Sequence, residues 1–151
     1  ESASRDAKEM LFVYYNYMRD ILAIDGIIGE KTPEERFGGA DHTYTVEQIM
    51  QDGKALQSAT SHDLGQHFSK AFDIKFLNEN GVLENAWTTS WGSTTRMMGA
   101  LFMSHSDDDG LILPPSVAPY QIVIIPVVKT TLASLGLLPV AKAFNALLFI
   151  I

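Results

Sequence analysis

One arginine stands out among the residues whose type and position could do chemistry. Arg96 is the only cation between Lys75 and Lys129, and it falls in the first turn of a predicted helix whose other residues are mostly apolar. A cation at that end opposes the helix dipole, and a buried guanidinium without a partner is costly. A phosphate would resolve both problems, because free N–H groups and threonine hydroxyls could converge on it beside the guanidinium. A structural ion pair with an internal carboxylate explains the same pattern equally well.

A second polar cluster lies where a predicted strand gives way to a predicted helix. It runs Gln57-Ser58-Ala59-Thr60-Ser61-His62-Asp63. Polar groups at strand ends suit the orientation of a small ligand, although ordinary turn and capping chemistry is a competing interpretation. A hydrolase triad is disfavoured, because adjacent residues rarely meet the geometry it requires and no G-x-S-x-G elbow is present.

Metal chemistry finds little support in the residue types. The chain has no cysteine, which excludes disulfide scaffolds and iron–sulfur sites, and its four histidines lack the spacing of a zinc site. The acidic turn 107–110 lacks the downstream glutamate of a calcium loop.

Length and charge narrow the class of protein further. With 151 residues, 46% of them hydrophobic, the chain suits one core and is too short for two full domains. The net charge is −7 and no stripe of Lys and Arg marks a duplex-binding face. All 18 acids precede residue 110, whereas the apolar tail 130–151 is broken by Gly136, Pro139, Lys142 and Asn145, so we do not expect a membrane span. The first residues do not resemble a signal peptide.

Hydrophobic periodicity predicts helices and strands in alternation. We expect helices at 6–24 and 94–105, the second of them buried, and a short helix after Asp63 with a capping box between Asp63 and Gln66. Residues 25–42 are expected to form a loop. Strands are expected at 43–50, 55–60, 74–77, 82–91, 111–113 and 121–128, with hairpin turns at Asp52-Gly53 and Asn80-Gly81. Antiparallel strands with interspersed helices indicate an α+β domain.

The motifs along this frame resemble those of one enzyme family, prolyl-tRNA synthetase of the archaeal and eukaryotic type. The matching segments are Phe37-Gly38-Gly39-Ala40-Asp41, Thr43-Tyr44-Thr45-Val46-Glu47, Asp52-Gly53-Lys54-Ala55-Leu56-Gln57, Thr60-Ser61-His62, Leu64-Gly65-Gln66, Ser90-Trp91-Gly92, Thr95-Arg96, Gly99-Ala100 and residues 110–115. They cover about residues 8–128, in order and without large gaps.

The resemblance implies a proline–tRNA ligase of class II, which activates proline with ATP and transfers it to tRNA(Pro) in translation. By position, Gln57, Thr60, Thr94 and Arg96 would contact ATP, with Arg96 as the catalytic arginine of motif 3. Three further residues, His62, Trp91 and Gly92, would form the proline pocket, and Gln57 would also lie near Mg²⁺. ATP and Mg²⁺ are the implied cofactors. The implied parent is a cytoplasmic homodimer with no membrane association.

The chain also departs from the family pattern. Relative to the family it begins after motif 2, so we expect residues 1–118 to be the C-terminal part of the catalytic domain, built on an antiparallel sheet flanked by helices, and inactive alone. Residues 119–151 are expected to hold the truncated start of an anticodon-binding-like domain followed by an atypical apolar tail. A non-catalytic, synthetase-derived nucleotide-binding or protein-interaction module is the alternative function.

Overall fold

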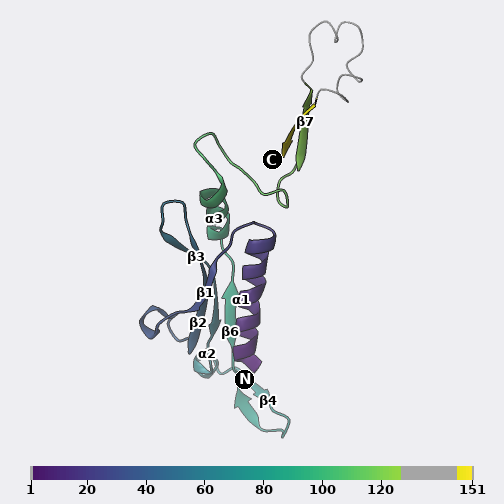
Figure 1. Ribbon diagram of the computed structural model, residues 1–151. Helices are drawn as coiled ribbons and strands as arrows, with labels where there is room; N and C mark the ends of the chain where they lie inside the picture. Colours follow the sequence, from purple (N-terminus) through teal and green to yellow (C-terminus); the bar gives the residue numbers. More distant parts are fainter. Residues whose placement is uncertain (1, 127–145, 151) are drawn as a thin grey trace, which may run out of the picture. The chain divides into compact units, whose positions relative to one another are not determined.

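The computed structural model describes residues 2–126 and 146–150, which fall into two compact units, residues 1–104 and 105–151. The first unit holds nearly all the helices and strands of the described chain (Figure 1). Its helices are α1 (Ser2–Asp20), the 3-10 helix η1 (Pro33–Glu35), α2 (His67–Ala71) and α3 (Arg96–His105), the last residue of which falls in the second unit. Its strands are β1 (Ile27–Glu30), β2 (His42–Ile49), β3 (Ala55–Asp63), β4 (Lys75–Leu77), β5 (Leu83–Asn85) and β6 (Thr89–Gly92).

The centre of the first unit is a four-stranded antiparallel sheet in the order β1-β2-β3-β6. The predicted strands at 43–50 and 55–60 are confirmed as β2 and β3, joined by a turn in which Gly53 has a φ of +80°. That left-handed backbone is why the turn needs a glycine. The architecture is therefore α+β with an antiparallel sheet, as predicted.

Helix α1 packs along one face of this sheet (Figure 1). Its buried residues Ala7, Leu11 and Met18 repeat at helical spacing and so share one stripe. The helix begins earlier and ends earlier than the predicted 6–24, at Ser2 and Asp20. Ile21, which follows the last residue of the helix, is 38% exposed.

Three local predictions were wrong. The capping box does not form, because Asp63 ends strand β3 and its Oδ1 accepts the Gly65 N–H at 3.0 Å, while α2 begins only at His67. The segment expected as a loop contains strand β1, which extends the sheet beyond β2. The expected strand 82–91 is two strands that belong to different sheets, because β5 pairs with β4 and β6 pairs with β3.

Helix α3 is present as predicted, but only one side of it is buried. Met97, Ala100 and Leu101 are buried, whereas Met98 is 56% and Met103 is 47% exposed. The prediction that this helix is buried, which was based on its apolar composition, was therefore wrong for the side that carries Met98 and Met103.

The second unit contains β7 (Ile122–Pro126), which pairs antiparallel with β8 (Ala146–Ile150). The strand expected at 121–128 is confirmed over its described part, and the strand expected at 111–113 does not form. Most of the tail that we expected to be atypical lies outside the described residues. Within the part that the structure describes, no helix is both long and apolar enough to cross a membrane.

Candidate functional site

The two faces of the four-stranded sheet differ in what covers them. Register pairs Tyr44 with Ser61 and Val46 with Ala59 on the face that α1 covers, where Lys8 of α1 lies 5.5 Å from the centroid of the Tyr44 ring. Residues directly opposite each other in an antiparallel pair point to the same side. Alternation then places the neighbouring pairs, such as Thr45 with Thr60, on the other face, which we call the open face.

A β-bulge decides which face receives Gln57. The register between β2 and β3 shifts so that Glu47 pairs with Gln57 and Ser58 has no partner in the ladder. The Ser58 hydroxyl hydrogen-bonds to Gln48 Oε1, and Gln48 Nε2 contacts Met18 Sδ of α1 at 3.5 Å, so Ser58 points to the α1 side. Because β3 has this one extra residue, the residues before the bulge point to the opposite face from the one that strict alternation would give them. As a result Gln57 joins Thr60 and His62 on the open face.

These residues line a cavity of about 220 Å³ at one end of the open face. Its lining combines strand residues with the segment that follows β1: Lys31, Glu35, Arg36, Phe37, Thr43, Gln57, Thr60 and His62. The structure thus brings together three of the predicted site residues, Gln57, Thr60 and His62. A second hollow of about 420 Å³ on the same face is lined by residues that include Thr45 and Glu47.

His62 is the most constrained polar group of this cavity. Its Nδ1 lies 3.0 Å from Thr43 Oγ1, and its ring centroid lies 4.9 Å from that of Phe37. Burial, and next the positive charge of Lys31, lower the pKa of His62 below 6.5. The ring is therefore neutral at pH 7 and can donate one hydrogen bond and accept another.

The loop that carries Phe37 is held against the end of β3. The Asp41 N–H donates to the Asp63 carbonyl at 2.8 Å, and Asp41 Oδ1 lies 3.0 Å from His67 Nε2. Gly39 has a φ of +88°, and a Cβ there would lie 2.9 Å from the Phe68 ring. The close approach and the left-handed backbone both require glycine at this position.

Arg96 reaches toward the same strand from the start of α3. Its Nη1 donates to the Gln57 carbonyl at 3.2 Å, and its backbone N–H donates to Thr94 Oγ1 at 3.2 Å. Within residues 2–104, the described part of the unit that holds Arg96, no carboxylate lies within 4.0 Å of the guanidinium. The structural ion pair that the sequence left open is thus absent from the described part of this unit, and the exposed guanidinium is able to receive an anion.

The remaining predicted site residues divide between the two faces. Gly92 pairs with Thr60 and so lies on the open face, whereas Trp91 pairs with Ser61. The face of Trp91 is also that of Thr89, whose hydroxyl donates to Asp6 of α1 at 2.8 Å. The structure therefore does not bring Trp91 together with His62.

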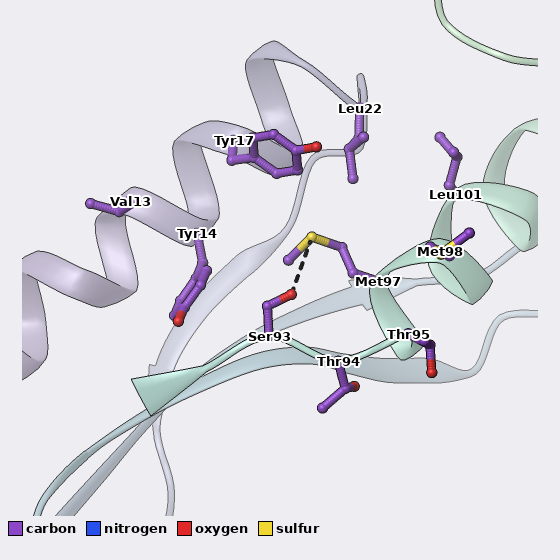
Figure 2. A pocket seen from close by; sticks show the side chains of 10 residues that line it. All are labelled: Val13, Tyr14, Tyr17, Leu22, Ser93, Thr94, Thr95, Met97, Met98 and Leu101. Atoms are coloured by element: carbon purple, nitrogen blue, oxygen red, sulfur yellow. Dashed lines mark hydrogen bonds between the residues drawn. The ribbon is translucent and has the colours of Figure 1, made fainter. Parts of the chain in front are cut away.

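Thr94 lines a different and larger cavity, of about 520 Å³, between α1 and α3 (Figure 2). Side chains from both helices face this space, among them Tyr14, Tyr17 and Met97, and Ser93 Oγ lies 3.8 Å from Met97 Sδ. The lining is mostly apolar, and none of the polar residues of the open face belongs to it. Its size alone does not make it the site of chemistry.

No protein-family model matches the chain. It is 58% identical over 128 residues to a proline–tRNA ligase of Amoebophilus asiaticus, a match that covers 85% of this chain and 26% of that protein. A proline–tRNA ligase of Flavobacterium johnsoniae is 55% identical over 130 residues, covering 86% of this chain and 26% of its own length. The chain is homologous to a segment of prolyl-tRNA synthetase. It spans about a quarter of the length of these curated relatives.

A solved structure supports the same relationship for the fold. The prolyl-tRNA synthetase of Cryptosporidium parvum, complexed with L-proline and AMP, matches with a TM-score of 0.75 and 44% identity. The match covers 80% of this chain and 25% of that one. The fold of this chain, including its antiparallel sheet, is therefore similar to part of that prolyl-tRNA synthetase.

Sequence reasoning missed several residues of the open face. Thr43 and Phe37 contact His62, Ser90 pairs with it across β3 and β6, and Glu47 pairs with Gln57. All four fall within or directly beside motifs that carried the family resemblance. The signal available was alternation along 43–47, which already placed Thr43 and Glu47 on one side of a strand.

Proposed function

We propose that the chain is the motif 3 segment of a proline–tRNA ligase, and that its open face helps to hold proline and ATP. The observation that carries the proposal is the convergence of Gln57, Thr60, His62 and Arg96 about the bulged part of β3. The 55–58% identity to proline–tRNA ligases over about 85% of the chain supports it. The Cryptosporidium parvum relative is complexed with L-proline and AMP, which is consistent with a nucleotide and an amino acid on this fold.

The proposed reaction has two steps. The carboxylate of proline attacks the α-phosphate of ATP, which forms prolyl-adenylate and releases pyrophosphate. The terminal adenosine hydroxyl of tRNA(Pro) then attacks the prolyl carbonyl and releases AMP. Neither step requires a side-chain nucleophile, so catalysis rests on position and on stabilisation of developing charge.

Arg96 has the central role in the first step. Its guanidinium is exposed, carries no ion pair within residues 2–104, and is oriented by the hydrogen bond that it donates to the Gln57 carbonyl. A planar guanidinium can bind two phosphate oxygens at once, which positions the phosphate as well as neutralising it. Thr94, whose hydroxyl accepts the Arg96 N–H, orders the turn from which the guanidinium extends.

We assign His62 and Gly92 to the proline side of the site, and Gln57 and Thr60 to the nucleotide side. The neutral His62 ring adds no second cation beside Lys31, and Gly92 leaves room opposite Thr60 because it has no side chain. Trp91 lies on the α1 face, so any effect on proline would pass through strand β6 rather than through contact.

The open face also offers oxygen atoms suited to Mg²⁺. The Gln57 amide lies opposite the Glu47 carboxylate, to which Thr45 Oγ1 donates at 3.3 Å. Among the described residues no group of three or more His, Cys, Asp or Glu side chains forms a closed metal cage. One carboxylate and one amide fit an ion that takes its remaining ligands from water and phosphate. Such an ion would neutralise phosphate charge while Gln57 and Glu47 hold it.

The proposal extends to the whole protein: tRNA(Pro) as the second substrate, a homodimer, and the cytoplasm, where aminoacyl-tRNA is consumed. These follow from the family resemblance.

A chimaera tests the proposed function. Residues 2–126 replace the matching segment of the Amoebophilus asiaticus ligase, and proline-dependent ATP–pyrophosphate exchange is measured against the unmodified ligase. We expect exchange to be retained within about tenfold, since most of the matched positions are identical. A folded chimaera without exchange would contradict the proposal and favour a non-catalytic binding or interaction module.

A further inference from the structure

Thr43 lies beneath the cavity of the open face and is 1% exposed. Its hydroxyl makes two contacts: the Phe37 N–H donates to Oγ1 at 3.1 Å, and His62 Nδ1 lies 3.0 Å from the same oxygen. Phe37 also places its ring 4.9 Å from the His62 ring. One buried threonine thus connects the loop after β1 to the histidine of the site.

The direction of the Thr43–His62 hydrogen bond follows from which atoms near the Thr43 hydroxyl can donate or accept a proton. Oγ1 already accepts the Phe37 N–H, and the hydroxyl has one proton of its own to place. His62 Nδ1 is the acceptor within reach. If Nδ1 carried the proton instead, Oγ1 would accept twice and the buried Thr43 proton would have no acceptor, which is unfavourable.

We infer that Thr43 is a positioning residue that holds His62 as the tautomer protonated at Nε2, so that the ring presents one N–H donor to the cavity. Nε2 forms no hydrogen bond with any residue of the described chain, yet it is absent from the buried polar atoms that lack a partner. It is therefore accessible from the cavity that His62 lines.

The inference rests on the proposed function only for the identity of the acceptor. A fixed N–H donor in a site for an amino acid and a nucleotide suits an oxygen acceptor, such as the carboxylate or carbonyl oxygen of the bound prolyl group. A tautomer fixed in advance requires no rearrangement when that ligand binds.

The direction of the Thr43–His62 hydrogen bond can be tested by whether the pKa of His62 rises or falls when the Thr43 hydroxyl is removed. His62 is titrated by nitrogen-15 NMR in the 151-residue chain, in wild type, Thr43→Val and Thr43→Ser. A threonine that donates to Nδ1 stabilises the neutral ring, so its removal by Val should raise the pKa of His62 by about half a unit or more. Thr43→Ser retains a hydroxyl and should restore the wild-type value. The other charged groups of the cavity, Lys31, Glu35 and Arg36, are unchanged in both variants.

The nitrogen-15 shifts give a second readout, because the protonated and unprotonated ring nitrogens resonate far apart. In wild type and Thr43→Ser we expect Nε2 to carry the proton almost exclusively, and in Thr43→Val we expect a mixture. A lowered or unchanged pKa in Thr43→Val, or a proton on Nδ1 in the wild type, would overturn the inference.

Two comparisons separate a failure of this inference from other failures. If Thr43→Val does not fold, Thr43→Ala is titrated instead, and the same sign is required. In the chimaera, Thr43→Val should raise the KM for proline by about tenfold or more with a smaller effect on the KM for ATP. Were the chimaera inactive while the pKa of His62 rose as expected, the proposed function would fail and the role of Thr43 would stand.

Discussion

The two faces of the four-stranded sheet use the same strands for opposite purposes. On the α1 face, residues such as Val46 and Ala59 are buried, with 0% and 4% exposure, where α1 packs against β2 and β3. The open face presents hydroxyl, amide, imidazole and carboxylate groups around partly open cavities. Stability and ligand chemistry are thus separated by the alternation of a strand, so that each can change with little effect on the other.

The strongest test of this separation is a core substitution on the α1 face. Leu11→Ala should lower the free energy of unfolding by about 2–5 kcal/mol, because Leu11 is 2% exposed and its removal leaves a cavity. Urea unfolding followed by circular dichroism measures the change. The matched control is Phe12→Ala on the same helix, where the side chain is 52% exposed and the cost should stay below about 1 kcal/mol. Equal costs for the two variants would show that α1 is not anchored as described.

Arg96 provides the converse test, a large functional effect with a small effect on stability. In the chimaera, Arg96→Ala should reduce proline-dependent exchange by an amount equivalent to about 2–4 kcal/mol of transition-state stabilisation. Arg96→Lys keeps the charge but loses the planar fork, so exchange should still fall. Urea unfolding of the same variants should change by less than about 1 kcal/mol, since the contact to the Gln57 carbonyl is exposed. A loss of stability with exchange retained would contradict the phosphate role.

Two serines on the α1 face should respond in opposite directions. Ser58 bonds to the buried Gln48 amide, so Ser58→Ala leaves that carbonyl without its partner and should cost about 1–3 kcal/mol. Ser61 is 0% exposed and its hydroxyl has no hydrogen-bond partner among the described residues, so Ser61→Ala should be neutral or stabilising by up to about 1 kcal/mol. Thermal unfolding of both variants measures the difference. If Ser58→Ala left the stability unchanged, the bulge would not depend on the hydrogen bond between Ser58 and Gln48.

The smallest expected effect is a dependence of stability on pH from the open face. Because burial and Lys31 lower the pKa of His62, the unfolded chain takes up the proton first as the pH falls. The stabilisation from this group is therefore fully present above pH 6.5 and is lost as the pH falls through the lowered pKa. Urea unfolding from pH 7.5 to 5, compared between wild type and His62→Gln, isolates this contribution. Parallel curves for the two proteins would show that His62 is not desolvated.

The sequence by itself determined the central hairpin of the sheet, strands β2 and β3 with the turn between them. Alternating residues over 43–50 and 55–60, with Asp52-Gly53 between them, specify a hairpin because strand periodicity and turn chemistry are local properties. The motifs that contain Thr60 and His62 carried the resemblance to the synthetase family, whereas the predicted strand ended at residue 60 and so did not place His62 on a face. The polar character of the site was therefore predictable, as was the unusual position of Arg96.

Only the tertiary structure decided how these residues meet. Strict alternation from Thr60 would place Gln57 on the α1 face, but the bulge at Ser58 moves it to the open face. The bulge could not be predicted, because it depends on the pairing of β2 with β3 and on contacts to α1. The same holds for Trp91, whose side is fixed by register with Ser61, and for Thr43, whose contact to His62 joins residues 19 positions apart. Each outcome depends on which distant elements pack together. No window of neighbouring residues contains that information, because side-chain type fixes local geometry but not the partner across the sheet.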